Sequence, residues 1–297
     1  MFGIDPDVRC RHRDAGHDGR RDDRHDDRYD GHEGWARRVG MKRMMARLGV
    51  GNADVETVLD RSEVLPGGLV TGTVTVRGGK VDQEINEVRV ALEATVEVET
   101  DDSTWYENVS FGTRSIGGKF TVAANQETGG RFELPVPWQT PITDVGGWHL
   151  HGMKIGVKTT VDIPGAVDPG DLDPVNVHPL PVQEAVLAAL GDLGFRFHSA
   201  DVEKGRLSGS DLPFYQEIEL HPGGEYARRI KELEVTFLVD PSGMDVVLEA
   251  DRRGGLLRSG GDALSRLRVG HHDTDRHHLA GLLHEQLQRL GARRGWF

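Results

Sequence analysis

Apolar and polar residues alternate with a period of two over one long stretch of this chain, residues 87–99. The even positions are all apolar, and the odd positions are charged or polar apart from Ala91. Such a period is typical of a β-strand with one buried face and one polar face. At roughly 3.3 Å per residue the strand would be roughly 40 Å long, so it needs a wide apolar surface opposite it, which a second sheet would supply.

Shorter segments with the same alternation lie on both sides of this stretch, and pairs of glycine separate several of them. Glycine provides the positive φ angles that turns need, so these pairs indicate breaks between antiparallel strands. About seven strands without a helical period predict an antiparallel β-sandwich over residues 41–163. The alternating segments besides the long one are 55–59, 70–76, 120–122, 132–136 and 155–163.

A second β-rich domain is predicted after a proline-rich connector. Residues 164–181 contain five prolines, which favours a linker. Residues 182–190 then have helical spacing, and alternation returns in three later segments. The sequence Asp-Pro-Ser-Gly at 240–243 suits a tight turn between two of these strands. The strands expected in this second domain, residues 182–253, are 214–220, 233–239 and 244–250.

The two ends of the chain differ from this pattern. Residues 1–40 are rich in Arg, Asp, His and Gly and have few aliphatic side chains, so we expect a disordered arm, with Met41 as an alternative start. Residues 41–48 are basic and amphipathic. Residues 254–297 are expected to be a polar tail that ends in an amphipathic helix at 278–290, whose leucine stripe needs a partner surface.

Composition narrows the classes of function. The formal net charge is −12, and no extended basic stripe is present, which argues against nucleic-acid binding. The single cysteine, Cys10, excludes an intrachain disulfide and a multi-cysteine zinc site, and fits a reducing cytoplasm. We find no signal-peptide core and no apolar run long enough for a membrane span. We therefore expect a cytoplasmic protein.

One segment resembles a phosphate-binding loop, and the resemblance is incomplete. Residues 112–120 read GTRSIGGKF. The motif requires lysine directly after its second spaced glycine, followed by Ser or Thr. Here Gly118 separates Gly117 from Lys119, and Phe120 stands where the hydroxyl that binds magnesium would be. We interpret the segment as a hairpin turn.

Several groups of histidine and aspartate residues have the side chains that metal ions bind. None has a complete ligand set at the spacing of a known site, so solvated or structural roles are favoured. We accordingly assign no catalytic, cofactor-binding or metal-binding residue, and no cofactor. The groups considered are His12, His17, His25 and His32; His149 and His151; Asp168, Asp171 and Asp173 with Asn176; and His271, His272, His277 and His278.

A set of segments resembles the bacterial sporulation-control protein family. These are MKRMMARLGVGNADVETVL, PGGLVTGTVTVRGGKVDQEINEVRVALEATVEVE, PVPWQTPIT, VNVHPLP, LGF and LPFYQEIEL, spread over residues 41–255. The resemblance implies two tandem arrestin-like antiparallel β-sandwich domains, with short helices and a C-terminal helix, and a regulatory role in sporulation or cell differentiation. It carries over no site residues, because the motifs are structural.

Function is therefore predicted to be non-enzymatic and to depend on protein partners. Glu93, Glu97 and Glu99 on the polar face of the long strand are candidates for contact with a basic partner. Self-association through the C-terminal helix is a further expectation. The alternatives are a carbohydrate-acting or carbohydrate-binding β-sandwich, which the 6% aromatic content disfavours, and a peripheral membrane protein that uses residues 41–48, for which the basic segment is short.

Overall fold

The computed structural model describes residues 53–100, 103–165, 167–252 and 263–292. Three predictions fall outside these residues: the disordered N-terminal segment at 1–40, the alternative start at Met41 and the amphipathic segment 41–48. The described part is mostly β-structure, with two α-helices. None of its helices has the length and apolar character needed to cross a membrane.

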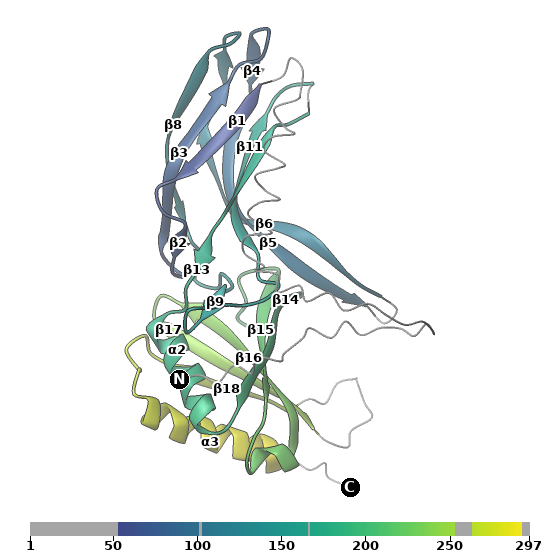
Figure 1. Ribbon diagram of the computed structural model, residues 1–297, viewed down its shortest axis with the longest axis vertical. Helices are drawn as coiled ribbons and strands as arrows, with labels where there is room; N and C mark the ends of the chain where they lie inside the picture. The colour runs from purple at the N-terminus through teal and green to yellow at the C-terminus, as the bar shows by residue number, and fades with distance from the viewer. Residues whose placement is uncertain (1–52, 101–102, 166, 253–262, 293–297) are drawn as a thin grey trace, which may run out of the picture.

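The upper half of the molecule in Figure 1 contains a three-stranded antiparallel sheet with the order β1-β3-β8. It lies against strands β11 and β12, and buried hydrogen bonds join the two layers. The Thr57 hydroxyl is 2.6 Å from the Thr159 hydroxyl, and the Thr57 amide donates to Asp171 Oδ2 at 2.8 Å. The strands of this sheet are β1 (Asp54–Leu59), β3 (Leu69–Arg77) and β8 (Glu127–Pro135).

A nine-stranded sheet runs through both halves of the molecule. Its order is β12-β11-β5-β14-β15-β16-β17-β18, and β6 also pairs with β5. The strands are β5 (Glu87–Thr100), β6 (Ser103–Gly117), β11 (Ile155–Asp162), β12 (Gly170–Pro174), β14 (Arg196–Lys204), β15 (Phe214–His221), β16 (Ile230–Asp240), β17 (Gly243–Arg252) and β18 (Ala263–Val269). Short two-stranded pairs complete the described β-structure: β2 (Glu63–Val64) with β13 (Asn176–Val177), β4 (Gln83–Ile85) with β7 (Phe120–Val122), and β9 (Asp144–Val145) with β10 (Trp148–His149).

Strand β5 confirms the prediction made from alternation. Val90, Leu92, Ala94 and Val96 on its apolar face are fully buried. The strand pairs antiparallel with β11 on one side and with β6 on the other, while its distal part also meets β14 in parallel, where Glu203 lies opposite Glu97. β5 therefore connects the sheet of the upper half to that of the lower half.

The distal parts of β5 and β6 form a hairpin that projects sideways from the body of the molecule (Figure 1). We call this hairpin the arm. Trp105 and Tyr106 on β6 are 44% and 61% exposed. Exposed aromatic side chains on a projecting element are common at protein interfaces, so the arm is a candidate contact surface.

Helices α2 (Pro181–Asp192) and α3 (Arg276–Ala292) lie against each other in the lower half (Figure 1). α2 begins with Pro181, and the Gln183 side chain accepts a hydrogen bond from the Leu180 amide at 2.8 Å. The short 3-10 helix η1 (Tyr226–Arg228) contacts α3 through a 2.5 Å hydrogen bond between Tyr226 and His284. Most of the predicted leucine stripe of α3 is buried against the rest of the chain: Leu279, Leu283, Leu287 and Leu290 are at most 2% exposed, whereas Leu282 is half-buried.

Truncation of this stripe should destabilise the protein. Leu283 is fully buried, so Leu283→Ala removes apolar contacts and leaves a cavity between α3 and its neighbours. We expect a loss of about 2–5 kcal/mol in the free energy of unfolding, measured by urea denaturation. If α3 instead bound a second copy of the chain, the variant would change the oligomeric state, measured by light scattering, and the monomer's stability would be unaffected.

Three local predictions are wrong. The linker at 164–181 contains β12 and β13, because the backbone after Pro169 pairs along β11 and with β2. The tail at 254–297 contains β18, which pairs with β17. Residues 112–120 do not form a hairpin, since β6 pairs with β5 whereas β7 pairs with β4. The division of the chain into two domains stays a prediction.

Candidate functional site

The lower half of the nine-stranded sheet has one face packed on the core and one face rich in carboxylates. On β15, Ile218 and Leu220 are buried, so the residues between and beside them point to the opposite face. The same alternation orients the carboxylates of β14, β16 and β17. We call the resulting surface the acidic face; it consists of Asp201, Glu203, Glu217, Glu219, Glu232, Glu234 and Glu249, with Glu97 from β5.

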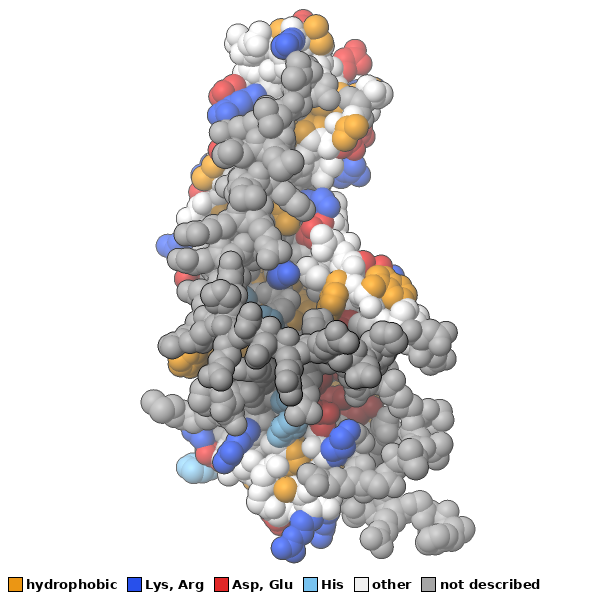
Figure 2. All heavy atoms as spheres, turned by 45° about the vertical axis from the view of Figure 1, so that its right-hand side comes forward, with side chains coloured by type: hydrophobic (Ala, Val, Ile, Leu, Met, Phe, Trp, Pro, Cys, Tyr) orange, Lys and Arg blue, Asp and Glu red, His pale blue; other side chains and the backbone are white. Residues whose placement is uncertain are grey.

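The strand registers place these carboxylates directly opposite one another. Asp201 lies opposite Glu217, and Glu219 lies opposite Glu234. Glu234 also lies opposite Glu249 on the next strand. Like charges at opposed positions of a sheet repel and destabilise it, so this row needs protons or other positive charge nearby. Figure 2 shows acidic side chains beside histidine side chains on the lower half of the molecule.

Burial and mutual repulsion shift the carboxylates toward their neutral forms. Burial, reinforced by Glu234, raises the pKa of Glu217 to about 9. Burial and the neighbouring Glu203 raise the pKa of Asp201 to about 8. The pKa of Glu234 is raised to about 7, again by burial first and by Glu249 next. At neutral pH the acidic face therefore holds protons that isolated carboxylates would have released.

One carboxyl oxygen of Asp201 lacks a hydrogen-bond partner. Its Oδ1 atom is buried and has no hydrogen-bond partner, whereas Glu203 accepts a hydrogen bond from the Tyr215 hydroxyl. An unpaired buried oxygen is unfavourable, because it has lost its contact with water without gaining another donor. The carboxyl groups of Asp201, Glu203 and Glu217 come close enough for their oxygens to lie within 4.8 Å of one another.

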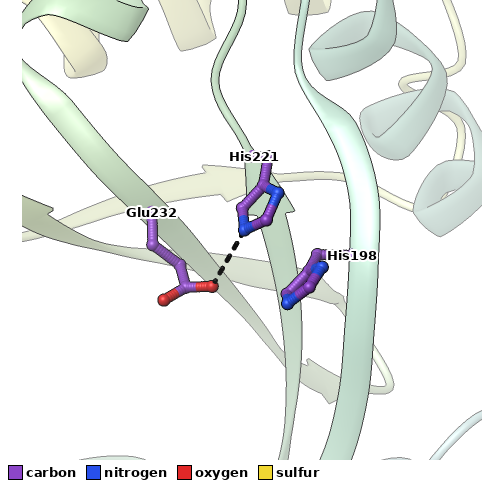
Figure 3. Close-up of side chains that lie close together, drawn as sticks. All are labelled: His198, His221 and Glu232. Atoms are coloured by element: carbon purple, nitrogen blue, oxygen red, sulfur yellow. Dashed lines mark ion pairs between the residues drawn. The ribbon is translucent and has the colours of Figure 1, made fainter. Parts of the chain in front are cut away.

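Two histidines and a glutamate lie at the end of the acidic face (Figure 3). His198 comes from β14, His221 from β15 and Glu232 from β16. The imidazole rings are stacked, with centroids 3.9 Å apart, and His221 Nε2 is 3.6 Å from Glu232 Oε1. One potential ligand atom from each residue lies within 4.8 Å of the others. We call these three residues the His-His-Glu cluster.

Two β-bulges flank this cluster. On β14 the register shifts between Phe197 and Ser199, so His198 is the extra residue. On β16 the register shifts between Ile230 and Glu232. A bulge changes the direction of a strand and re-aims its side chains, and bulges are frequent beside functional sites. Without the first bulge, His198 and Asp201 could not both lie on the acidic face, because residues three apart on a regular strand point to opposite sides.

The glutamates predicted on β5 have separate roles. Glu93 is only 6% exposed, and Lys158 Nζ on β11 donates to its Oε2 at 2.5 Å. Glu93 therefore forms an ion pair within the protein and does not contribute to a contact surface. Glu97 lies opposite Glu203 and joins the acidic face. Glu99 is exposed near the same place, and its charge contributes to the raised pKa of Glu203.

The structure does not bring the predicted His149 and His151 together as ligands on one strand. His149 ends the two-residue strand β10, and His151 lies in the following turn. The aspartates near residue 170 accept hydrogen bonds from backbone amides. Asp168 Oδ1 accepts one from the Ile163 amide at 3.2 Å, and Asp171 Oδ2 accepts one from the Thr57 amide.

The C-terminal histidines also have structural contacts. His271 Nε2 is 2.8 Å from the Asp240 carbonyl oxygen, and its ring lies against Trp138. The amides of His277 and His278 donate to Asp275 Oδ1 at the start of α3. His272 is exposed in the preceding turn. His12, His17, His25 and His32 lie outside the described residues.

Sequence reasoning missed the acidic face and the His-His-Glu cluster, although one signal was present. In FYQEIELH and ELEVTF the residues between the apolar positions are mostly acidic. A single strand does not reveal what lies opposite these residues. The registers turn separate acidic positions into one surface.

Three comparisons identify relatives of this chain. The family model described as "SpoOM protein" matches residues 41–254. The sporulation-control protein Spo0M of Bacillus subtilis (strain 168) is 35% identical over 218 residues, which are 73% of this chain and 82% of that protein. The crystal structure of Spo0M from Bacillus subtilis superposes with a TM-score of 0.71 at 32% identity, covering 81% of this chain and all of that one. The chain belongs to the SpoOM protein family.

Proposed function

We propose that this protein is a non-enzymatic cytoplasmic regulator of sporulation or cell differentiation that acts by binding other proteins. We further propose that its two halves are tandem arrestin-like β-sandwich domains. Family membership supports the link to sporulation, since the related Bacillus subtilis protein is named for sporulation control. The observation that carries the binding role is the acidic face.

The acidic face favours a basic partner for an energetic reason. In the free protein, opposed carboxylates such as Asp201 and Glu217 must take up protons or repel each other. Lysine and arginine side chains would replace those protons with fixed positive charge. Binding would then gain from relief of this repulsion as well as from new ion pairs. An anionic membrane would instead be repelled by this surface, which disfavours membrane binding through it.

The arm is the second proposed contact surface. Its aromatic residues Trp105 and Tyr106 are adjacent on β6, so their side chains point to opposite faces of the hairpin. Sugar-binding modules stack several aromatic rings on one surface, which this arrangement does not provide. Exposed aromatic residues beside a charged surface fit a protein interface, where apolar anchors and ionic contacts act together.

Partner capture from the native cell tests the proposal. The full chain serves as bait under crosslinking, alongside the variant Glu203→Gln/Glu217→Gln/Glu234→Gln. We expect the unmodified chain to recover specific proteins with basic surfaces, and the triple variant to recover them at least about tenfold less well. Raising the salt concentration should also weaken capture, because part of the affinity is electrostatic.

A matched control replaces the same number of glutamates elsewhere. Glu84, Glu133 and Glu225 are exposed and lie away from the acidic face, so their triple glutamine variant should capture partners normally. Deletion of α3 is unsuitable, because its leucines belong to the core. Equal capture by the two triple variants, or specific capture by none of the baits, would show that the acidic face does not bind partners.

A further inference from the structure

The His-His-Glu cluster has the composition of a metal site. Two neutral imidazoles and one carboxylate suit zinc and other divalent transition metals, and three protein ligands leave a coordination position open. We propose that His198, His221 and Glu232 bind a divalent transition metal ion, with zinc as the test ion. This inference is independent of the proposed binding of protein partners.

The distances fit such an ion. Zinc lies about 2.0–2.1 Å from nitrogen and oxygen ligands, so two ligand atoms of a tetrahedral site are about 3.4 Å apart. His221 Nε2 and Glu232 Oε1 are 3.6 Å apart, close to that spacing. All three ligand atoms lie within 4.8 Å of one another. The stacked rings must tilt so that their nitrogens converge, and the partial exposure of His198 and the exposure of His221 allow this.

The backbone places the ligands on three adjacent strands. His221 follows Leu220, which pairs with Leu233, so His221 and Glu232 occupy the next opposed position of β15 and β16. The bulge at His198 adds the third ligand from β14. Strands hold their side chains more rigidly than loops do, so little backbone movement is needed for binding.

Neighbouring groups support a cation here. Glu219 forms a hydrogen bond with Glu232, and the Ser199 hydroxyl donates to Glu219, so the carboxylate ligand has partners that orient it. Two nearby cations oppose binding: Lys231, which adjoins Glu232, and Arg196, which lies opposite His221. The carboxylates of Glu219 and Glu232 act in the other direction.

Zinc titration of the full chain, first treated with a chelator, tests the site. Imidazole ¹⁵N–¹H spectra should show the His198 and His221 nitrogens shifting together as the first equivalent is added, and calorimetry gives the affinity. His198→Asn and Glu232→Gln should each weaken this binding by at least about tenfold. Zinc should raise the melting temperature of the unmodified chain more than that of either variant.

The control variant is His151→Asn, an exposed histidine in a turn, which should leave the affinity unchanged. Melting without zinc shows whether each variant is folded. The proposal is wrong if the resonances of His198 and His221 do not move, or if both variants bind zinc like the unmodified chain. It is also wrong if only Asp201→Asn abolishes binding, because the ion would then sit in the carboxylate row.

Discussion

Raising the pH from about 5.5 to about 8.5 should lower the melting temperature of the metal-free protein by at least about 5 °C, provided that no partner is bound. The folded-state pKa values are about 9 for Glu217, about 8 for Asp201 and about 7 for Glu234. In the unfolded chain these groups titrate near 4, so between about pH 4 and 9 the folded state binds more protons. The stability that these three groups contribute is therefore fully present below about pH 4. It is lost as the pH rises through their folded-state pKa values.

Glu217→Gln tests the origin of this effect. Glutamine has nearly the same shape and carries no charge, so the variant should be more stable than the unmodified chain at pH 8.5 and lose less stability with rising pH. Glu84→Gln, at an exposed position of β4, should leave the pH dependence unchanged. Calorimetric melting of the three proteins at several pH values makes the comparison. Identical pH profiles for Glu217→Gln and the unmodified chain would contradict the prediction.

Leu92→Asp should unfold the protein, or destabilise it by more than about 3 kcal/mol. Leu92 is fully buried on β5, opposite Val157 of β11, and its neighbours on the same face are also fully buried. An aspartate there would be an unpaired charge without solvent. Because β5 connects the sheet of both halves, we expect the loss of structure to reach α2 and α3, as measured by circular dichroism and urea denaturation.

A charge on the paired strand provides the control. Thr104 of β6 lies opposite Glu99 and is exposed, so Thr104→Lys should change stability by no more than about 0.5 kcal/mol. If Leu92→Asp unfolded with the same midpoint as the unmodified chain, the burial of β5 would be wrong. The variant says nothing about function, since it removes the fold on which any surface depends.

Local alternation was enough to predict most strands of the lower half. Leu233 and Val235 on β16, and Val246 and Leu248 on β17, are fully buried as expected, and the turn at 240–243 joins these strands. Strand β18 was not predicted, because its alternation of apolar and polar residues is weak. Leu264 is 43% exposed, Leu267 is partly buried and Val269 is buried in the core. Such incomplete burial is common for an edge strand.

Strand β12 was not predicted, because two of its buried residues are aspartates. Asp171 and Asp173 point inward and are 7% and 8% exposed, so the usual rule that aspartate lies outside fails. Asp171 is stable there because the Thr57 amide, 114 residues earlier in the chain, donates to it. No pattern within residues 164–181 contains that information, and the five prolines favoured a linker.

The sequence by itself determined which positions of β5, β16 and β17 face the core, and the family resemblance over residues 41–255 agrees with the match to residues 41–254. Only the tertiary structure decided which outward side chains meet. The reason is physical: alternation depends on neighbours along one strand, whereas the pairing of Glu219 with Glu234 depends on register between strands. The bulge that directs His198 toward His221 and Glu232 is likewise set by pairing, so the acidic face and the His-His-Glu cluster exist only in the folded sheet.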